Sequence, residues 1–152
     1  MRMLIAAGGT GGHLFPGIAV GEVLREMDPA WDVLFVGGSR GIEKEILKKS
    51  GFPQEVLEVG RIKGEGWGGR LKTVLSLPRA LIEARRLLAR FRPNVLFGVG
   101  GYSSGPVVLA AFLERIPRAI LEPNSIPGFT NRILGRFVHR VFVAFPETAR
   151  FF

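Results

Sequence analysis

Residues 6–17 read AAGGTGGHLFPG and continue directly from the apolar run MLIAA at residues 3–7. Four of the five residues from 8 to 12 are glycine, and a histidine stands immediately after them. A glycine-rich turn between a strand and a helix directs free backbone N–H groups and the positive end of the helix dipole at one point. The stretch therefore predicts a strand, a loop suited to a phosphate or diphosphate, and a helix with Pro16 in its first turn.

The rest of the chain alternates between short apolar runs and longer segments with helical periodicity. The predicted strands are 3–7, 32–37, 55–59, 94–100, 118–122 and 140–145, and the predicted helices are 15–28, 40–50, 71–91, 105–115 and 127–136. Regular alternation of this kind is typical of a doubly wound α/β fold with a mostly parallel sheet, here of about six strands.

Two further loops follow predicted strands. GVGGYSSGP at 98–106 repeats the strand, glycine loop and helix, with Ser103 and Ser104 as additional hydrogen-bond donors. LEPNSIPGFTNR at 121–132 supplies a third, polar loop. Because ligands of parallel sheets bind at the carboxyl ends of the strands, we expect all three loops to lie along one edge. Two glycine loops facing one cleft would hold a diphosphate from both sides.

Composition and length predict one domain with its own core over residues 1–152. The chain is 47% hydrophobic, has no cysteine and carries a formal net charge of +8. It has no apolar run long enough for a membrane span, so we expect a cytoplasmic protein. The absence of cysteine excludes disulfides and thiolate metal sites. An excess of positive charge suits binding to nucleic acid, anionic lipid or phosphorylated ligands. Some genomes also encode arginine-rich proteins generally, so the position of the charges along the chain has to distinguish these explanations.

Two nucleotide-binding motifs are not met. The first loop reads G-G-T-G-G-H, which does not match G-x-G-x-x-G, and the second predicted strand ends FVGGSR without an acidic residue for a ribose. The chain also lacks the GK[ST] of a P-loop. The hypotheses of a dinucleotide-binding motif and of a P-loop are therefore both weakened.

His13 stands where the first loop becomes a helix. The positive end of a helix favours the neutral imidazole, which could act as a general base on a substrate hydroxyl. Contact with a phosphate and simple loop packing remain alternatives. His139 lies away from any glycine loop, and we expect it to be structural.

Three stretches together resemble the amino-terminal domain of the MurG family: GGTGGHLFPGIAVGEVL, GVGGYSSGPVVLAA and EPNSIPGFTNRIL. The resemblance runs from residue 2 to the end of the chain, in matching order and spacing. Members of this family are inverting, metal-independent glycosyltransferases with two Rossmann-like domains, the GT-B fold. They transfer N-acetylglucosamine from UDP-N-acetylglucosamine to undecaprenyl-diphosphate-linked N-acetylmuramyl pentapeptide (lipid I) in peptidoglycan synthesis, as peripheral proteins on the inner face of the plasma membrane.

The resemblance implies that this chain is the Rossmann-like acceptor-binding half of such an enzyme, with no metal and no cofactor. His13 would be the candidate catalytic base, and Glu122, Asn124 and Asn131 would be polar residues of the cleft. The residues implied in binding the acceptor diphosphate are Gly8, Gly9, Thr10, Gly11, Gly12, Gly100, Gly101, Tyr102, Ser103 and Ser104.

The chain departs from the family in two ways. The third motif usually begins His-Glu-Gln-Asn, whereas here Leu121 and Pro123 replace the first and third residues. The UDP-sugar domain is also absent, so we expect these residues alone to be inactive, because donor and acceptor must be aligned in one cleft. An excised domain, a truncated relative and one half of a split transferase with a separate donor-binding chain are all compatible with this, and whether the chain is an enzyme stays open.

The segment at 60–93 concentrates the positive charge. It contains nine lysines and arginines against Glu65 and Glu83, and its predicted helix has a wider apolar face than docking on a sheet requires. Pro78 is expected to kink this helix or split it. Excess apolar side chains among cations are typical of a helix at an anionic membrane surface. The residues expected to contact the membrane are Trp67, Leu71, Lys72, Leu75, Arg79, Ile82 and Arg86.

Two other functions compete with the transferase half. A non-catalytic, membrane-associated module that binds a polyprenyl diphosphate or scaffolds a partner would share the same loops and the same basic helix. Nucleic-acid binding is disfavoured, because the chain lacks aromatic residues interleaved with its cations.

Overall fold

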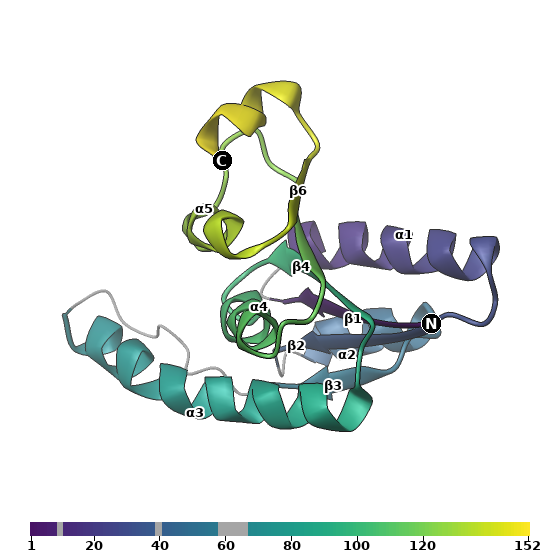
Figure 1. Cartoon of the computed structure of the whole chain (residues 1–152), viewed down its shortest axis with the longest axis horizontal. Helices are drawn as coiled ribbons and strands as arrows, with labels where there is room; N and C mark the ends of the chain where they lie inside the picture. Colours follow the sequence, from purple (N-terminus) through teal and green to yellow (C-terminus); the bar gives the residue numbers. More distant parts are fainter. Residues whose placement is uncertain (9–10, 39–40, 58–66) are drawn as a thin grey trace.

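The computed structural model describes residues 1–8, 11–38, 41–57 and 67–152, with side chains described in these ranges except at 41–42 and 67–76. Its strands form one parallel sheet in the order β3-β2-β1-β4-β5-β6, with helices on both faces (Figure 1). The strands are β1 (Arg2–Ala7), β2 (Asp32–Gly37), β3 (Gln54–Val56), β4 (Val95–Gly100), β5 (Arg118–Glu122) and β6 (Arg140–Val143). The helices are α1 (Gly11–Met27), α2 (Gly41–Lys49), α3 (Trp67–Phe91), α4 (Ser104–Leu113) and α5 (Phe129–Leu134), with 3₁₀ turns η1 (Gly135–Phe137) and η2 (Pro146–Phe151).

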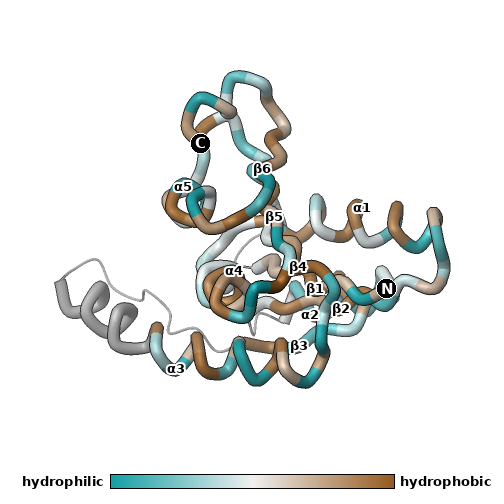
Figure 2. Tube along the Cα trace, in the orientation of Figure 1, coloured by the Kyte–Doolittle hydropathy of each residue, from teal (hydrophilic) through white to brown (hydrophobic). Residues whose placement is uncertain are grey.

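The central strands are buried on both faces, which explains why they read as continuous apolar runs. Along β1, Leu4 and Ala6 face a cluster formed with α3 and α4, whereas Ile5 faces a second cluster formed with α1 and α2. The hydropathy trace is largely brown around the central strands β1 and β4 (Figure 2). The two clusters confirm the predicted doubly wound α/β fold.

The start of α1 differs from the prediction. The helix begins at Gly11, four residues earlier than expected, so His13 lies in its first turn. Pro16 consequently lies inside the helix, and its placement in the first turn was wrong. A helix can start on glycines because its first N–H groups need no intrahelical partner, and here they lie beside the carboxyl end of β1.

The remaining boundaries agree with the pattern to within a few residues, with three exceptions. Strand β3 ends at Val56, and residues 58–59 of the predicted strand lie outside the described residues. Helix α3 is continuous through Pro78, so it is not split there. The predicted last helix is shorter and continues as η1, which turns the chain into the edge strand β6.

Candidate functional site

The loops after β1 and β4 emerge at the point where the strand order reverses. β1 pairs with β2 on one side and β4 on the other, and the register of β1 and β4 shifts as Ala7 comes opposite Gly100. The region outside the carboxyl ends of the strands at such a reversal is where doubly wound sheets bind ligands. The fold therefore places these loops along one edge of the sheet, as predicted.

The two glycine loops touch through their backbones. Gly101 has a φ of +82°, and a Cβ built on it would overlap the carbonyl oxygen of Gly8. Gly100 has a φ of +104°. Both values lie in the region that L side chains avoid, so glycine is required here for conformation and for the close approach.

The hydroxyls of Ser103 and Ser104 face the protein. Ser104 donates its hydroxyl to the carbonyl oxygen of Gly101 at 2.9 Å, and both serines are fully buried. The Oγ of Ser103 lies against Gly8 and has no hydrogen-bond partner among the described residues. Both serine side chains therefore lie inside the protein, and the hydroxyl of Ser104 fixes the loop through its hydrogen bond to Gly101.

His13 packs across Gly100. A Cβ on Gly100 would stand 2.7 Å from Cδ2 and 2.9 Å from Nε2 of the imidazole, and 3.2 Å from Nδ2 of Asn131. Burial lowers the pKa of His13 below its ordinary value of 6.5, and the negative charge of Glu122 opposes this by raising it. Because burial is the larger influence, the imidazole is neutral at pH 7, the state that a general base requires.

The buried carboxylate of Glu122 holds the third loop in place through hydrogen bonds. Its side chain is 1% exposed, and its two carboxylate oxygens accept four hydrogen bonds. The donors are the backbone N–H and Nδ2 of Asn124, the backbone N–H of Gly128, and Nδ2 of Asn131. Asn131, which is 2% exposed, also donates to the carbonyl oxygen of Leu121 at 3.1 Å. Of the three predicted polar residues of the cleft, only Asn124 is exposed; the other two hold the loop in place.

The loop after β2 adds residues that the sequence analysis did not select. The hydroxyl of Tyr102 lies against Gly38, and Gln54 donates its Nε2 to the carbonyl oxygen of Gly38 at 3.4 Å. Glu43, in the first turn of α2, is 2% exposed beside the same glycine. An acidic residue in a first helical turn was the only signal for Glu43, and that signal is common on ordinary surfaces.

The remaining predicted residues either lie outside the described part of the chain or belong to α3. Gly9 and Thr10 lie outside the described residues, as do the side chains of Trp67, Leu71, Lys72 and Leu75. Arg79, Ile82 and Arg86 are exposed on α3. In the described part of the chain no group of His, Asp and Glu could hold a metal ion, and no helix is long and apolar enough to cross a membrane.

The fold and the loops define a Rossmann-like domain in which two glycine loops meet at the topological switch point of the sheet. Residues 3–143 match the glycosyltransferase family 28 N-terminal domain, and the chain belongs to this family.

The chain is similar over its whole length to transferases of one kind. It is 55% identical to the UDP-N-acetylglucosamine--N-acetylmuramyl-(pentapeptide) pyrophosphoryl-undecaprenol N-acetylglucosamine transferase of Anaeromyxobacter sp. (strain Fw109-5) and 53% identical to that of Myxococcus xanthus (strain DK1622). In each case the alignment covers 100% of this chain and 40% of the relative. The chain therefore spans well under half the length of these curated relatives.

Solved structures agree with this assignment. The crystal structure of Acinetobacter baumannii MurG matches with a TM-score of 0.84 and 33% identity, over 97% of this chain and 42% of that one. The UDP-GlcNAc 2-epimerase of Neisseria meningitidis matches with a TM-score of 0.72 at 13% identity, over 99% of this chain and 42% of that one, which shows the shared fold alone. The chain thus has the architecture of the amino-terminal half of a GT-B glycosyltransferase.

Proposed function

We propose that this chain is the acceptor-binding half of an inverting N-acetylglucosaminyltransferase of peptidoglycan synthesis. The observation that carries the proposal is the contact between the two glycine loops, Gly101 against the carbonyl of Gly8, with His13 lying over Gly100. Each loop leads into a helix, α1 at Gly11 and α4 at Ser104. The first N–H groups of a helix have no intrahelical partner, so two helix N-termini at one edge of the sheet are suited to the diphosphate of a lipid-linked sugar such as lipid I.

His13 supplies the base in this proposal. In an inverting transfer, the acceptor hydroxyl loses its proton to the imidazole as its oxygen bonds to the anomeric carbon, and the bond from that carbon to the UDP oxygen breaks on the opposite face. A neutral imidazole can accept the proton, and burial keeps His13 neutral. The Glu122–Asn131 pair holds the loop next to it.

Donor binding is assigned to residues other than these 152. The relatives are more than twice as long as this chain, and an inverting transfer needs donor and acceptor in line. We propose that a further domain or a separate chain binds UDP-N-acetylglucosamine. The replacement of a His-Glu-Gln-Asn pattern by LEPN is compatible with this role, because the carbonyl of Leu121 still accepts from Asn131 and the carboxylate of Glu122 keeps all its donors.

The acceptor also requires the domain to reach a membrane, and α3 supplies exposed apolar and cationic side chains for this. Leu77 and Ile82 are 41% and 51% exposed. A groove of about 650 Å³ between α3 and the segment that follows α4 is lined by Ile82, Arg85 and Arg86 among others. Along its described length α3 alternates brown and teal, apolar and polar (Figure 2).

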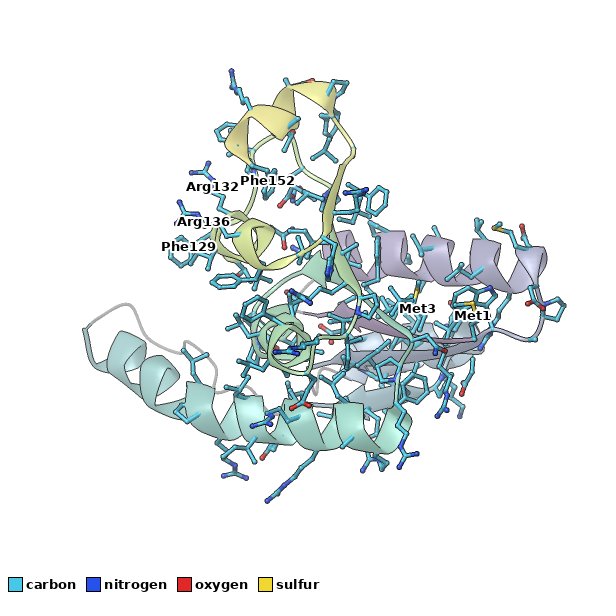
Figure 3. All side chains as sticks on the ribbon, viewed as in Figure 1. Met1, Met3, Phe129, Arg132, Arg136 and Phe152 are labelled. Carbon is cyan, nitrogen blue, oxygen red and sulfur yellow. The ribbon has the colours of Figure 1, made fainter. Side chains whose placement is uncertain are left out.

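Helix α5 adds a second such surface. Phe129 is 80% exposed, and Phe129 and Arg132 of α5 and Arg136 of η1 project from the same outer side of the molecule (Figure 3). Exposed apolar side chains surrounded by cations favour binding at an anionic bilayer surface. We propose that α3 and α5 hold the domain as a peripheral protein on the inner face of the plasma membrane.

Acceptor binding is tested by isothermal titration calorimetry of the 152-residue chain with a short-chain lipid I analogue and with inorganic pyrophosphate. Both should bind to the wild type, and Gly101→Ala should weaken both by about tenfold or more, since it moves the two loops apart. Gly51→Ala, at the opposite edge of the sheet, should change neither. Equal affinities of the wild type and Gly101→Ala for these ligands would show that the glycine loops do not form the acceptor site.

Catalysis is tested by fusing this chain to the donor half of the Anaeromyxobacter relative and supplying UDP-N-acetylglucosamine with the lipid I analogue. His13→Gln should lower kcat by about 10²–10⁴-fold while acceptor affinity changes little. Turnover that survives His13→Gln would deprive this residue of its role as base. A fusion that binds the acceptor without any turnover would favour the non-catalytic polyprenyl-diphosphate module instead.

Membrane binding is tested by co-sedimentation with vesicles containing phosphatidylglycerol. Leu77→Asp combined with Ile82→Asp should release the chain from the vesicles. Val23→Asp, at an equally exposed apolar position on α1 across the sheet, should not. Release by Val23→Asp alone, or retention of the double variant, would contradict the proposed orientation.

A further inference from the structure

A pocket lined by two arginines and a histidine lies at the opposite end of β5 from the glycine loops. It has a volume of about 360 Å³ and is lined by Phe112, Leu113, Arg115, Arg118 and His139. Arg118 begins β5, whereas Glu122, which organises the third loop, ends it. The pocket is therefore separate from the proposed acceptor site, and the argument for it does not depend on that assignment.

Arg118 is a buried cation without a counter-charge. Its side chain is 8% exposed, and no carboxylate pairs with it in the described part of the chain. Its Nε donates to the carbonyl oxygen of Phe137, and Nη1 donates to that of Ile116 at 2.9 Å. The guanidinium also lies 4.8 Å from the ring centre of Phe112. Two backbone acceptors use only part of its five N–H groups.

The surroundings of Arg118 suit an anion. Burial lowers the pKa of Arg118, as expected where a positive charge loses part of its hydration. Arg115 and His139 line the same pocket, and none of the lining residues is acidic. A buried charge is unfavourable unless an opposite charge compensates it. Among the described residues no carboxylate supplies that charge to Arg118, and the pocket has the donors to receive it from a ligand.

We infer that this pocket binds a phosphate ester, with Arg118 as its principal ligand. The planar guanidinium offers paired N–H groups that match phosphate oxygens, and Arg115 adds a second cation. The volume lies at the lower end of the range for small-molecule sites, about 300–1,000 Å³. Phe112 and Leu113, 42% and 54% exposed, form an apolar wall that would contact the carbon skeleton of the ester. The headgroup of a phospholipid and a soluble phosphate ester share this chemistry.

The inference is tested on the 152-residue chain by ¹H–¹⁵N NMR titration with inorganic phosphate and with sn-glycerol 3-phosphate. Saturable shifts are expected at the amides of Arg115, Arg118 and His139, and not at Gly100 or Gly101. Arg118→Met, which replaces the buried charge with an apolar side chain of similar length, should weaken binding by about tenfold or more. Arg140→Gln removes an exposed charge outside the pocket and should leave the affinity unchanged.

Vesicles distinguish the two sources of the phosphate. If the ligand is a lipid headgroup, Arg118→Met lowers binding to phosphatidylglycerol vesicles while Arg140→Gln does not; if it is a soluble ester, only the titrations respond. Arg115→Gln, an exposed substitution, repeats the test should Arg118→Met fail to fold. The inference is overturned if the wild type shows no saturable response to phosphate, glycerol phosphate or anionic vesicles. It is equally overturned if both pocket variants bind as the wild type does.

Discussion

Gly101→Ala is the substitution that tests the geometry on which the proposed acceptor site depends. Two penalties combine at this position. The φ of +82° is unfavourable for any residue with a Cβ, and the new Cβ would overlap the carbonyl oxygen of Gly8. This oxygen belongs to the backbone at the end of a buried strand, so it cannot rotate away as a side chain could.

Two other glycines separate the penalties. Gly51 has a φ of +69°, and the atom nearest to a built Cβ is 3.8 Å away, at the flexible end of Arg25, so Gly51→Ala measures the conformational penalty alone. Gly128 has a φ of −63° and no atom within 4 Å of a built Cβ, so Gly128→Ala measures neither. We expect losses in the free energy of unfolding of about 1 kcal/mol at Gly51 and about 0.5 kcal/mol or less at Gly128. At Gly101 the steric overlap adds about 1–3 kcal/mol, for a total of about 3 kcal/mol.

Urea unfolding followed by circular dichroism measures all three variants, with the slope of each transition checked for constancy. The informative quantity is the difference between Gly101→Ala and Gly51→Ala, because the two share the penalty for positive φ. A difference below about 0.5 kcal/mol would mean that the loops after β1 and β4 do not touch as described. The convergence of their N–H groups on one ligand would then lose its basis.

Two further predictions concern the third loop and His13. Glu122→Gln keeps the shape of the side chain but turns an NH₂ group towards donors from Asn124, Gly128 or Asn131. The free energy of unfolding, measured by urea titration, should therefore fall by about 2–3 kcal/mol. A loss below about 0.5 kcal/mol would contradict the buried network. An NMR pH titration should give His13 a pKa below 6.5, and Glu122→Gln should lower it further by removing the charge that raises it. Because the folded pKa is the lower one, the stability that His13 contributes is lost as the pH falls from about 6.5 through the folded value. A His13 pKa that rises in Glu122→Gln would refute the assigned causes.

The sequence by itself determined the order of the elements and the edge at which the loops meet. Strands such as 32–37 and 118–122 are apolar runs because both faces of a parallel sheet are covered, and this signal is local. Parallel strands place their carboxyl ends together, so the glycine loops had to share an edge. The start of α1 was less predictable, because glycines score poorly as helix formers although a first turn tolerates them.

Only the tertiary structure decided which polar groups of the loops are exposed and which are buried. Ser103 and Ser104 were predicted to bind the acceptor diphosphate and Glu122 to be a polar residue of the cleft, and packing buries the side chains of all three. His13 lies over Gly100 and beside Asn131, residues far from it in the chain. The buried Arg118 has no carboxylate partner among the residues that the structure describes. Burial and charge compensation depend on contacts between distant segments, and a local pattern of residue types carries no record of them.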